Sequence, residues 1–588
     1  MKNYLYHATI FASMMLAVSC DDMLDMQPET NPSDAVVWNS AASFEKEVNN
    51  YYSFLPYFQD KTNKRGIADR ESMSDIVLSE DTENGYSNST YTAPETDNFY
   101  EEYFNNLRSI NYFFKNREGY ADKDEIKQYY AEALFFRAYI SFRMFKDYGP
   151  LTIVKDVIET SSPELFAARA TRDEFADFII GDLEEAINTG ALPVQKKIVS
   201  TDQNGRITIG AARALLAEVC LFEGTWQKYH FQNTERSNAL LTKAATYAEQ
   251  VMNDDSYQLF YDEKLGVDSY HYMFTLESLS KTNPAGVLKE TNKEYILRNR
   301  FHETKRQLGQ NTVHAFQMTN MTRKFVEMFL DKNGQASKPD YKTSLNSYYK
   351  DRDPRLSTLA FSVGDLRWSY ESASNFERNA ADSAKAIFTK WNGCGFYVKK
   401  YATERAMSPT ESGMDVPIIR LAEVYLIYAE AKCELDNGAI SDADLDKSLN
   451  RLRDRVLMPH LTNATVPDGS TLLEEIRKER TRELYLEGFR FDDVRRWKTA
   501  EKEMGGNLEG VYIGTGSAFA KDWTLTSPYG QADIIYLAAN NTQRSMSADG
   551  YAIREAASRR TFAKRNYLLP LPTKQIGLNP QLKNNEGW

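Results

Sequence analysis

Three short stretches of the sequence place aromatic rings beside hydrogen-bonding side chains. Aromatic faces stack on the C–H groups of sugars, while amide, hydroxyl and guanidinium groups form hydrogen bonds around the rim of such a site. The stretches lack helical periodicity, so we expect them in loops or short strands. They predict an oligosaccharide site, and the alternative for each ring is packing in the core. The candidate ligand-binding residues are Tyr86, Asn88, Tyr91, Tyr270, Tyr272, Arg367, Trp368 and Tyr370.

A second chemistry, general acid and base catalysis, needs two neighbouring carboxylates, and residues 479–497 are rich in them. Such a pair would suit a glycosidase. On a helix, however, side chains three residues apart face each other, and an arginine beside a carboxylate keeps it ionised and occupied. We therefore interpret this segment as a structural ladder of charges. The expected pairs are Glu479 with Arg482, Arg480 with Glu483, and Glu487 with Arg490.

The chain contains few of the His and Cys residues that bind metals or cofactors. There are 6 His and 4 Cys, with no CxxC pair and no HExxH motif, which are the spacings that zinc sites use. Cys220 and Cys433 fall among apolar helical positions and are expected to be buried thiols. The sequence thus predicts no metal site, no cofactor and no disulfide scaffold.

The net charge and the tyrosine content also limit the function. A net charge of −12 argues against a nucleic-acid partner, because phosphate binding needs a basic surface. The chain contains 36 Tyr, whose flat apolar face and polar tip suit a hydrated binding surface. A binding protein with a polar ligand is therefore favoured.

The N-terminus has the layout of a secretory signal. Lys2 precedes an apolar segment from about Tyr4 to Val18, and small residues lead to Cys20. The segment is too short for a membrane-spanning anchor, and no second run of about 18 apolar residues follows. It resembles a bacterial lipoprotein signal, which implies removal of residues 1–19 and lipidation of Cys20. The alternative is an ordinary signal peptide, or a Ser-Cys pair that occurs by chance.

Paired helices are expected to position the candidate residues. Apolar residues recur every three or four positions from Ala131 to Phe145, and a second helix begins at the capping box of Thr171 and Glu174. Similar pairs follow within residues 211–251 and 422–456. Small alanines on the first helix of each pair permit the close approach that tetratricopeptide-like hairpins require. A generic helical bundle is the alternative, since the pairs have no constant spacing.

The periodicity is lost between the second and third pairs, at about 260–415, and also at about 60–98 and 505–566. Long loops laid over a scaffold commonly carry a binding site. We therefore expect a mainly α protein with helical hairpins at about 99–256 and 416–503. The large irregular region at about 260–415 and 505–566 should hold the ligand.

Several motifs, each weak alone, occur in one order along the whole chain. They are the segments at residues 20–25, 147–151, 351–356, 479–497 and 565–572, with Leu578-Asn579-Pro580 and the final Asn585-Glu586-Gly587-Trp588. In this set the sequence resembles the SusD/RagB family of outer-membrane nutrient-binding lipoproteins.

The resemblance implies four tetratricopeptide-like hairpins and an irregular ligand region within one SusD-like domain, residues 20–588. It implies a non-catalytic protein that sits as a lid on a SusC-type TonB-dependent transporter, anchored in the outer membrane of a Bacteroidetes-like cell through Cys20. The family's sugar-contacting loops vary too much for its ligand residues to be transferred to this sequence.

Three functions remain open at this stage. The first is capture of an oligosaccharide, or of a peptide, and its delivery to the transporter. The second is a surface glycoside hydrolase with two acidic side chains, which 83 acidic residues cannot exclude. The third is a protein-interaction module built on the same helical hairpins.

Overall fold

The computed structural model describes most of the chain between residue 38 and the C-terminus. The described residues are 38–60, 65–79, 87, 90–199, 203–278, 283–310, 319–337, 340, 345–360, 367–372, 375–379, 396, 398–402, 412–512, 514 and 546–588.

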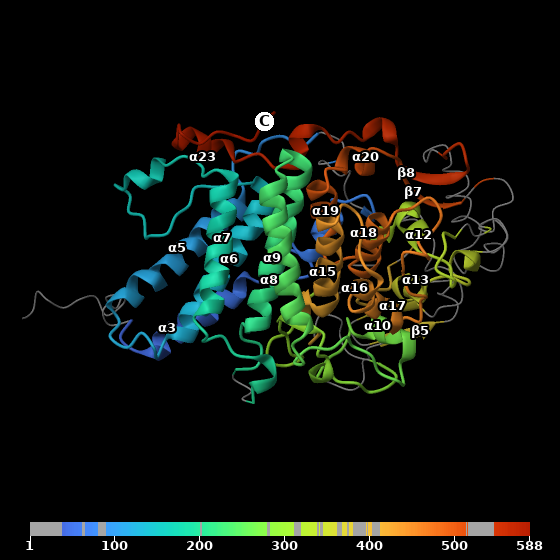
Figure 1. Ribbon diagram of the computed structural model, residues 1–588, viewed down its shortest axis with the longest axis horizontal. Coiled ribbons are helices and arrows are strands. Elements are labelled where there is room, and N and C mark those ends of the chain that lie inside the picture. The colour runs from blue at the N-terminus through green and yellow to red at the C-terminus, as the bar shows by residue number, and fades with distance from the viewer. Residues whose placement is uncertain are drawn as a thin grey trace, which may run out of the picture.

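Helices are the main secondary structure of the described chain, and the longer ones stand in a row from α5 to α18 across the molecule (Figure 1). This confirms the predicted mainly α fold class. The long helices are α3 (Ala41–Tyr51), α5 (Asn98–Gly119), α6 (Lys127–Tyr148), α7 (Arg172–Asn188), α8 (Ile209–Trp226), α9 (Thr234–Met252), α15 (Leu421–Leu435) and α18 (Leu472–Glu483). The short helices are α4 (Ile67–Glu71), α10 (Ser269–Tyr272), α12 (Arg323–Met328), α13 (Pro354–Leu359), α16 (Asp442–Asp446), α17 (Leu449–Arg455), α19 (Arg490–Arg496), α20 (Ala500–Met504) and α23 (Thr573–Leu578).

The first two predicted pairs form as antiparallel hairpins, α6 with α7 and α8 with α9. Thr171 and Glu174 make the expected capping box, in which each side chain accepts a hydrogen bond from the other residue's backbone N–H. Gly149 ends α6 with a φ of 72°. Helices α8 and α9 approach closely because Gly224 lacks a side chain: a Cβ there would lie 3.0 Å from Cγ of Leu241.

The third predicted pair differs from the expectation. Helix α15 packs on α9 and α18, but its expected single partner is divided into α16 and α17. The backbone of Ser448 leaves the helical region, with φ −127° and ψ −98°, and its hydroxyl donates to the carbonyl of Asp444. Such local side-chain bonds compete with a continuous helix.

The expected ladder helix is likewise broken. Helix α18 ends at Glu483, and the chain turns through Leu486 (φ 59°) and Gly488 (φ 86°) before α19 begins. At Gly488 a Cβ would lie 3.1 Å from the carbonyl oxygen of Ile67. This turn lets side chains of residues 479–497 reach distant parts of the chain instead of one another.

Within the described residues, the irregular stretches contribute four two-stranded antiparallel sheets. The strands are β1 (Val77–Ser79), β2 (Tyr295–Asn299), β3 (Thr319–Met321), β4 (Arg367–Ser372), β5 (Asn375–Asn379), β6 (Val416–Arg420), β7 (Leu508–Tyr512) and β8 (Tyr551–Glu555). Strand β1 pairs with β3, β2 with β6, β4 with β5, and β7 with β8. In the second sheet Tyr295 lies opposite Arg420, and α15 follows directly, so a buried arginine is placed at the start of a helix.

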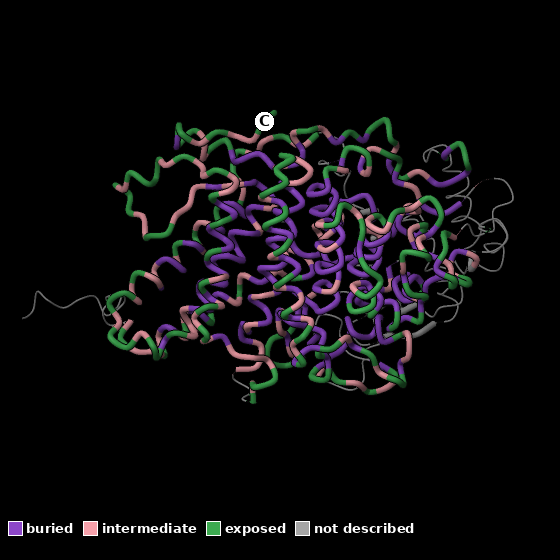
Figure 2. The backbone as a smooth tube through the Cα atoms, viewed as in Figure 1, coloured by how far each residue is buried: buried purple, intermediate pink, exposed green. Residues whose placement is uncertain are grey.

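The core follows the central helices, where Figure 2 shows buried backbone, while exposed backbone lies on the outer loops. Cys220 and Cys433 are buried free thiols, as predicted, and burial raises the pKa of each to about 12. Among the described residues, no helix combines the length and the apolar content needed to cross a bilayer.

Candidate functional site

The carboxylates of the expected ladder belong to a buried charge network. Only the Glu479–Arg482 pair forms as predicted, at 2.8 Å. Glu483 instead binds Arg355 at 3.0 Å and Arg420 at 2.7 Å. Further ion pairs join Arg420 and Glu483 to Arg455, Glu294, Glu487 and Lys400. We call these residues, together with Arg355, the buried charge network.

Arg490 and Arg480 also find other partners. Arg490 binds Asp75 at 2.8 Å, and Arg480 binds Asp493 at 3.0 Å. Two of the three expected pairs are therefore wrong, because the chain turns between α18 and α19 and brings closer partners from elsewhere.

The network keeps its carboxylates ionised. Burial would raise the pKa of Glu483, but Arg455, Arg420 and Arg355 lower it to about 2. Burial likewise opposes ionisation of Glu487, and Arg420 with Lys400 brings its pKa below the ordinary value. A general acid needs a proton near neutral pH and access to substrate, and these buried groups offer neither. The structural interpretation of this segment is thus supported by its geometry.

Two of the predicted ligand residues are buried. Tyr270 is 1% exposed and Tyr272 is 8% exposed. The hydroxyl of Tyr270 donates to the carbonyl oxygen of Glu483 at 2.6 Å, and the guanidinium of Arg455 lies 5.0 Å from its ring centroid. These rings lack the free face that stacking on a sugar requires. The sequence predicted that Tyr270 and Tyr272 contact a sugar, whereas in the structure both rings pack in the core.

Of the remaining predicted residues, the structure describes Tyr91 and the strand that holds Arg367, Trp368 and Tyr370. Tyr91 is half-buried and meets Trp588 edge-to-face, with ring centroids 5.9 Å apart. Arg367, Trp368 and Tyr370 lie in β4, whose backbone pairs with β5. Cys20, Tyr86 and Asn88 fall outside the described residues. Contact of these residues with a ligand stays a prediction.

Exposed tyrosines identify cavities that the sequence analysis did not single out. Of the tyrosines whose burial the structure describes, only Tyr57 (37%) and Tyr261 (50%) are exposed. Each of them lines a cavity, of 610 Å³ at Tyr57 and 500 Å³ at Tyr261. Because an exposed ring in a hollow is what a sugar ring needs for stacking, these two places are the candidates for carbohydrate binding.

The cavity at Tyr57, here the Tyr57 pocket, combines this ring with polar side chains. It lies between the chain that follows α3, helices α5 and α6, and residues 308–310, so the irregular stretches at about 60–98 and 260–415 contribute to it. Its lining residues are Ser53, Phe54, Leu55, Pro56, Tyr57, Gln59, Asp60, Arg65, Gly66, Phe99, Glu102, Arg143, Leu308, Gly309 and Gln310.

Backbone contacts fix the segment that carries Tyr57. The carbonyl oxygen of Tyr57 accepts a hydrogen bond from the backbone N–H of Ile67 at 3.1 Å, which attaches the segment to α4. The Gln310 side chain donates to the carbonyl of Gln59 at 2.5 Å and accepts from its N–H at 3.3 Å. Gly66 permits this packing, since a Cβ there would lie 2.6 Å from Cα of Gln59. The walls formed by residues 57–59 and by Gln310 are therefore in place before a ligand binds.

The polar groups of the Tyr57 pocket can bind hydroxyl groups. Arg143 donates to the carbonyl oxygens of Phe54 and Arg65, each at 3.3 Å, and its guanidinium lies 5.0 Å from the ring centroid of Phe99. A guanidinium has five N–H donors, so donors remain for a ligand. Gln59, Asp60 and Glu102 supply further amide and carboxylate groups in the lining.

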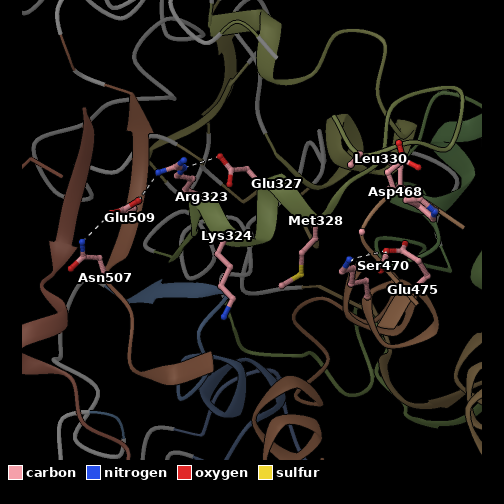
Figure 3. Close-up of a pocket in the computed structure, with 14 residues that line it drawn as sticks. Arg323, Lys324, Glu327, Met328, Leu330, Asp468, Ser470, Glu475, Asn507 and Glu509 are labelled. Atoms are coloured by element: carbon pink, nitrogen blue, oxygen red, sulfur yellow. Dashed lines mark hydrogen bonds and ion pairs between the residues drawn. The ribbon is translucent and has the colours of Figure 1, made fainter. Parts of the chain in front are cut away.

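A third cavity, of 380 Å³, is lined by charged residues of α12, the loop before α18, and β7. In Figure 3 Arg323 points toward Glu327 and Glu509, and Ser470 toward Glu475. Its described lining contains no aromatic side chain. Because most of its charged residues are paired with one another or with neighbours and it has no stacking face, it is a weaker candidate for a sugar.

Sequence reasoning missed Tyr57 because no aromatic pattern in the surrounding sequence separates an exposed ring from a buried one. Residues 51–58 contain five aromatic residues, Tyr51, Tyr52, Phe54, Tyr57 and Phe58, and Tyr51 and Phe58 among them are buried. Pro56, which ends the periodicity just before Tyr57, was the available signal.

Comparisons with known proteins agree with the resemblance seen in the sequence. A family model described as "SusD family" matches residues 289–588, and one described as "Starch-binding associating with outer membrane" matches residues 22–221. A SusD-like protein, P38, of Formosa agariphila is 20% identical over 517 residues, which are 86% of this chain and 93% of that protein.

Solved structures show the same fold. A SusD-like carbohydrate-binding protein of Bacteroides fragilis has a TM-score of 0.70 at 20% identity, over 93% of this chain and 100% of that one. A laminarin-binding SusD-like protein has a TM-score of 0.55 at 19% identity, over 94% of this chain and 100% of that one. Since the first family model spans more than half of the chain, this protein belongs to the SusD family.

Proposed function

We propose that the protein binds a glycan, in part through the Tyr57 pocket, and delivers it to a SusC-type TonB-dependent transporter. The observation that carries this proposal is the exposed Tyr57 ring in a 610 Å³ pocket with amide, carboxylate and guanidinium groups. The descriptions of the second family model as starch-binding, and of two structural neighbours as carbohydrate-binding and laminarin-binding, support a glycan ligand.

Residues outside the pocket complete the proposed ligand surface. They come from the irregular stretches that the sequence analysis selected, and they are Tyr86, Asn88, Tyr91, Arg367, Trp368 and Tyr370. Tyr270 and Tyr272 are left out because their rings are buried.

We propose a lipid anchor at Cys20 and attachment to the outer membrane at the cell surface. The phrase "associating with outer membrane" in the description of a model that begins at residue 22 supports this location. In this proposal residues 1–19 are the signal peptide and residues 20–588 the SusD-like domain. A binding role without catalysis is supported by the arginine-paired, buried carboxylates of residues 479–497.

Calorimetric titration tests the proposal with maltoheptaose, laminariheptaose and oligogalacturonides as probes. Tyr57→Ala should weaken binding of the cognate glycan about tenfold, the loss of one ring contact. Phe231→Ala removes an exposed ring outside the pocket and should leave affinity unchanged. Copurification with the transporter of the same cell tests the delivery role.

Other outcomes would select another function. Release of reducing ends from these glycans by the purified protein would indicate a glycoside hydrolase. Binding of peptides, with no glycan bound, would indicate peptide uptake. Binding to the transporter alone would indicate an interaction module.

A further inference from the structure

We propose that the cavity at Tyr261 is a second carbohydrate-binding site, one that takes a neutral hexose unit of a glycan. This Tyr261 groove shares no residue with the Tyr57 pocket. It lies where the chain after α9 meets α15 and α17, on the helical scaffold. Its lining residues are Tyr257, Gln258, Leu259, Tyr261, Tyr425, Arg451, Asp454, Arg455 and Leu457.

The groove has the groups that recognise a sugar. Tyr261 offers a half-exposed ring, and Gln258, Arg451 and Asp454 are exposed beside it. Arg451 forms no ion pair with any residue that the structure describes. Its side chain donates a hydrogen bond to the hydroxyl of Tyr425, and since a guanidinium has five N–H donors, others remain for a ligand. A guanidinium and an amide donate to sugar hydroxyls, and a carboxylate accepts from them. Asp454 Oδ1 lies 2.7 Å from Nε2 of His460, and the buried Arg455 is paired with Glu294 and Glu483. The exposed charges of the lining, Arg451 and Asp454, have opposite signs, so we assign a neutral sugar.

The two walls of the groove are tied to one buried carboxylate, Glu294. The backbone N–H of Phe260, next to Tyr261, donates to Glu294 Oε2 at 2.8 Å. Arg455, at the end of α17, binds the same carboxylate at 3.0 Å. Behind the first wall, the hydroxyls of Tyr257 and Thr208 lie 2.9 Å apart. The separation of the walls is thus set before a ligand arrives, which lowers the entropic cost of binding.

Leu457 supplies an independent indication. It follows α17 with a φ of 57°, and the N–H of Met458 donates to the carbonyl of Arg453 at 2.9 Å, the bond of a Schellman motif. Glycine is the usual residue at this position, and a left-handed leucine is a strained exception. Yet the Leu457 side chain is 75% exposed, so core packing does not explain it. Backbone strain at a residue that does not pack in the core is commonly found at functional sites, and we infer such a role for Leu457.

Calorimetry with neutral trisaccharides tests the proposal. The probes are maltotriose, laminaritriose and cellotriose. We expect wild-type protein to bind one of them at more than one site, with Tyr261→Ala removing one site and Tyr57→Ala removing the other. These two variants remove the two exposed tyrosines and so serve as matched controls for each other.

Leu457→Gly separates function from folding. It should weaken binding in the groove about tenfold, while the melting temperature stays equal to that of the wild type or rises, because glycine adopts the left-handed region without strain. The proposal is overturned if none of the trisaccharides binds in a Tyr261-dependent manner, or if peptides occupy the groove instead. A lower melting temperature for Leu457→Gly would also count against it. Binding that depends on Tyr57 alone would contradict this inference and leave the proposed function standing.

Discussion

Arg420 and Glu487 form the best-connected pair of the buried charge network. Nε of Arg420 donates to Glu487 Oε2 at 2.7 Å, and Nη2 donates to Oε1 at 2.9 Å. Both side chains are buried, and Lys400 adds a third hydrogen bond to the same carboxylate at 2.7 Å. Strand β6, through Arg420, and the segment 398–402, through Lys400, thus hold this carboxylate of the turn after α18 in place.

Removing Glu487 should destabilise the protein strongly. Glu487→Ala leaves Arg420 and Lys400 buried near an empty position, and breaking a buried pair costs about 3–5 kcal/mol. Glu327→Ala is the control, because its pair with Arg323 is partly exposed and should contribute less than about 1 kcal/mol. Denaturant unfolding measures both, and equal stabilities for the two variants would contradict this assignment.

The stability of the protein should fall in acid through Glu483. The folded-state pKa of this group is about 2, against an ordinary value of 4.5. A lowered pKa contributes stability above the unfolded-state value, and that contribution is lost as the pH falls from about 4.5 toward 2. Glu483→Gln should therefore flatten the dependence of unfolding free energy on pH in this window. An unchanged slope would show that other carboxylates cause the acid sensitivity.

Glu71 should lower the stability of the protein as the pH rises, the opposite of the effect of Glu483. Burial raises its pKa to about 8, although the N–H of Gly488 donates to it at 2.7 Å. A raised pKa means that the folded protein keeps a proton that the unfolded chain releases, so stability is lost as the pH rises from about 4.5 to 8. Glu71→Gln keeps an acceptor for Gly488 and should remove this loss. Thermal unfolding across this pH range measures the difference from wild type.

The sequence predicted what depends on neighbours along the chain. The capping box at Thr171 and Glu174 and the helix end at Gly149 involve residues within one or two turns, and the helical pairs follow from apolar spacing. By contrast, Arg420 and Glu487 are 67 residues apart, so no local pattern could pair them. The same holds for exposure: Tyr57 and Tyr270 look alike in sequence, and only the fold decides which ring reaches solvent.

Gly66 should prove essential for the shape of the Tyr57 pocket. In Gly66→Ala the new Cβ would lie 2.6 Å from Gln59 Cα and from the carbonyl oxygen of Phe58. Both contacts are with backbone, so the segment carrying Tyr57 must shift, at a cost of about 1–3 kcal/mol. Glycan affinity should fall with stability. Gly181→Ala in α7, where a Cβ meets nothing within 4 Å, should instead stabilise by about 0.5–1 kcal/mol.

Lipidation should depend on Cys20. Two or more acyl chains anchor a protein stably, whereas a single chain does not. Cys20→Ala protein should therefore leave the membrane fraction after a salt wash, while wild-type protein stays. Retention of the variant in the membrane would require another attachment.

The last prediction concerns Trp368, at a position in β4 that the sequence selected for ligand contact. If its ring stacks on the glycan, Trp368→Ala should weaken binding about tenfold, which corresponds to about 1.4 kcal/mol. The helices provide most of the buried core, so the circular dichroism spectrum and the melting temperature should not change. Titration of the cognate glycan into Trp368→Ala, Tyr57→Ala and the double variant shows whether both rings contact one ligand. A double variant with the affinity of Tyr57→Ala alone, and a folded spectrum, would remove Trp368 from the site.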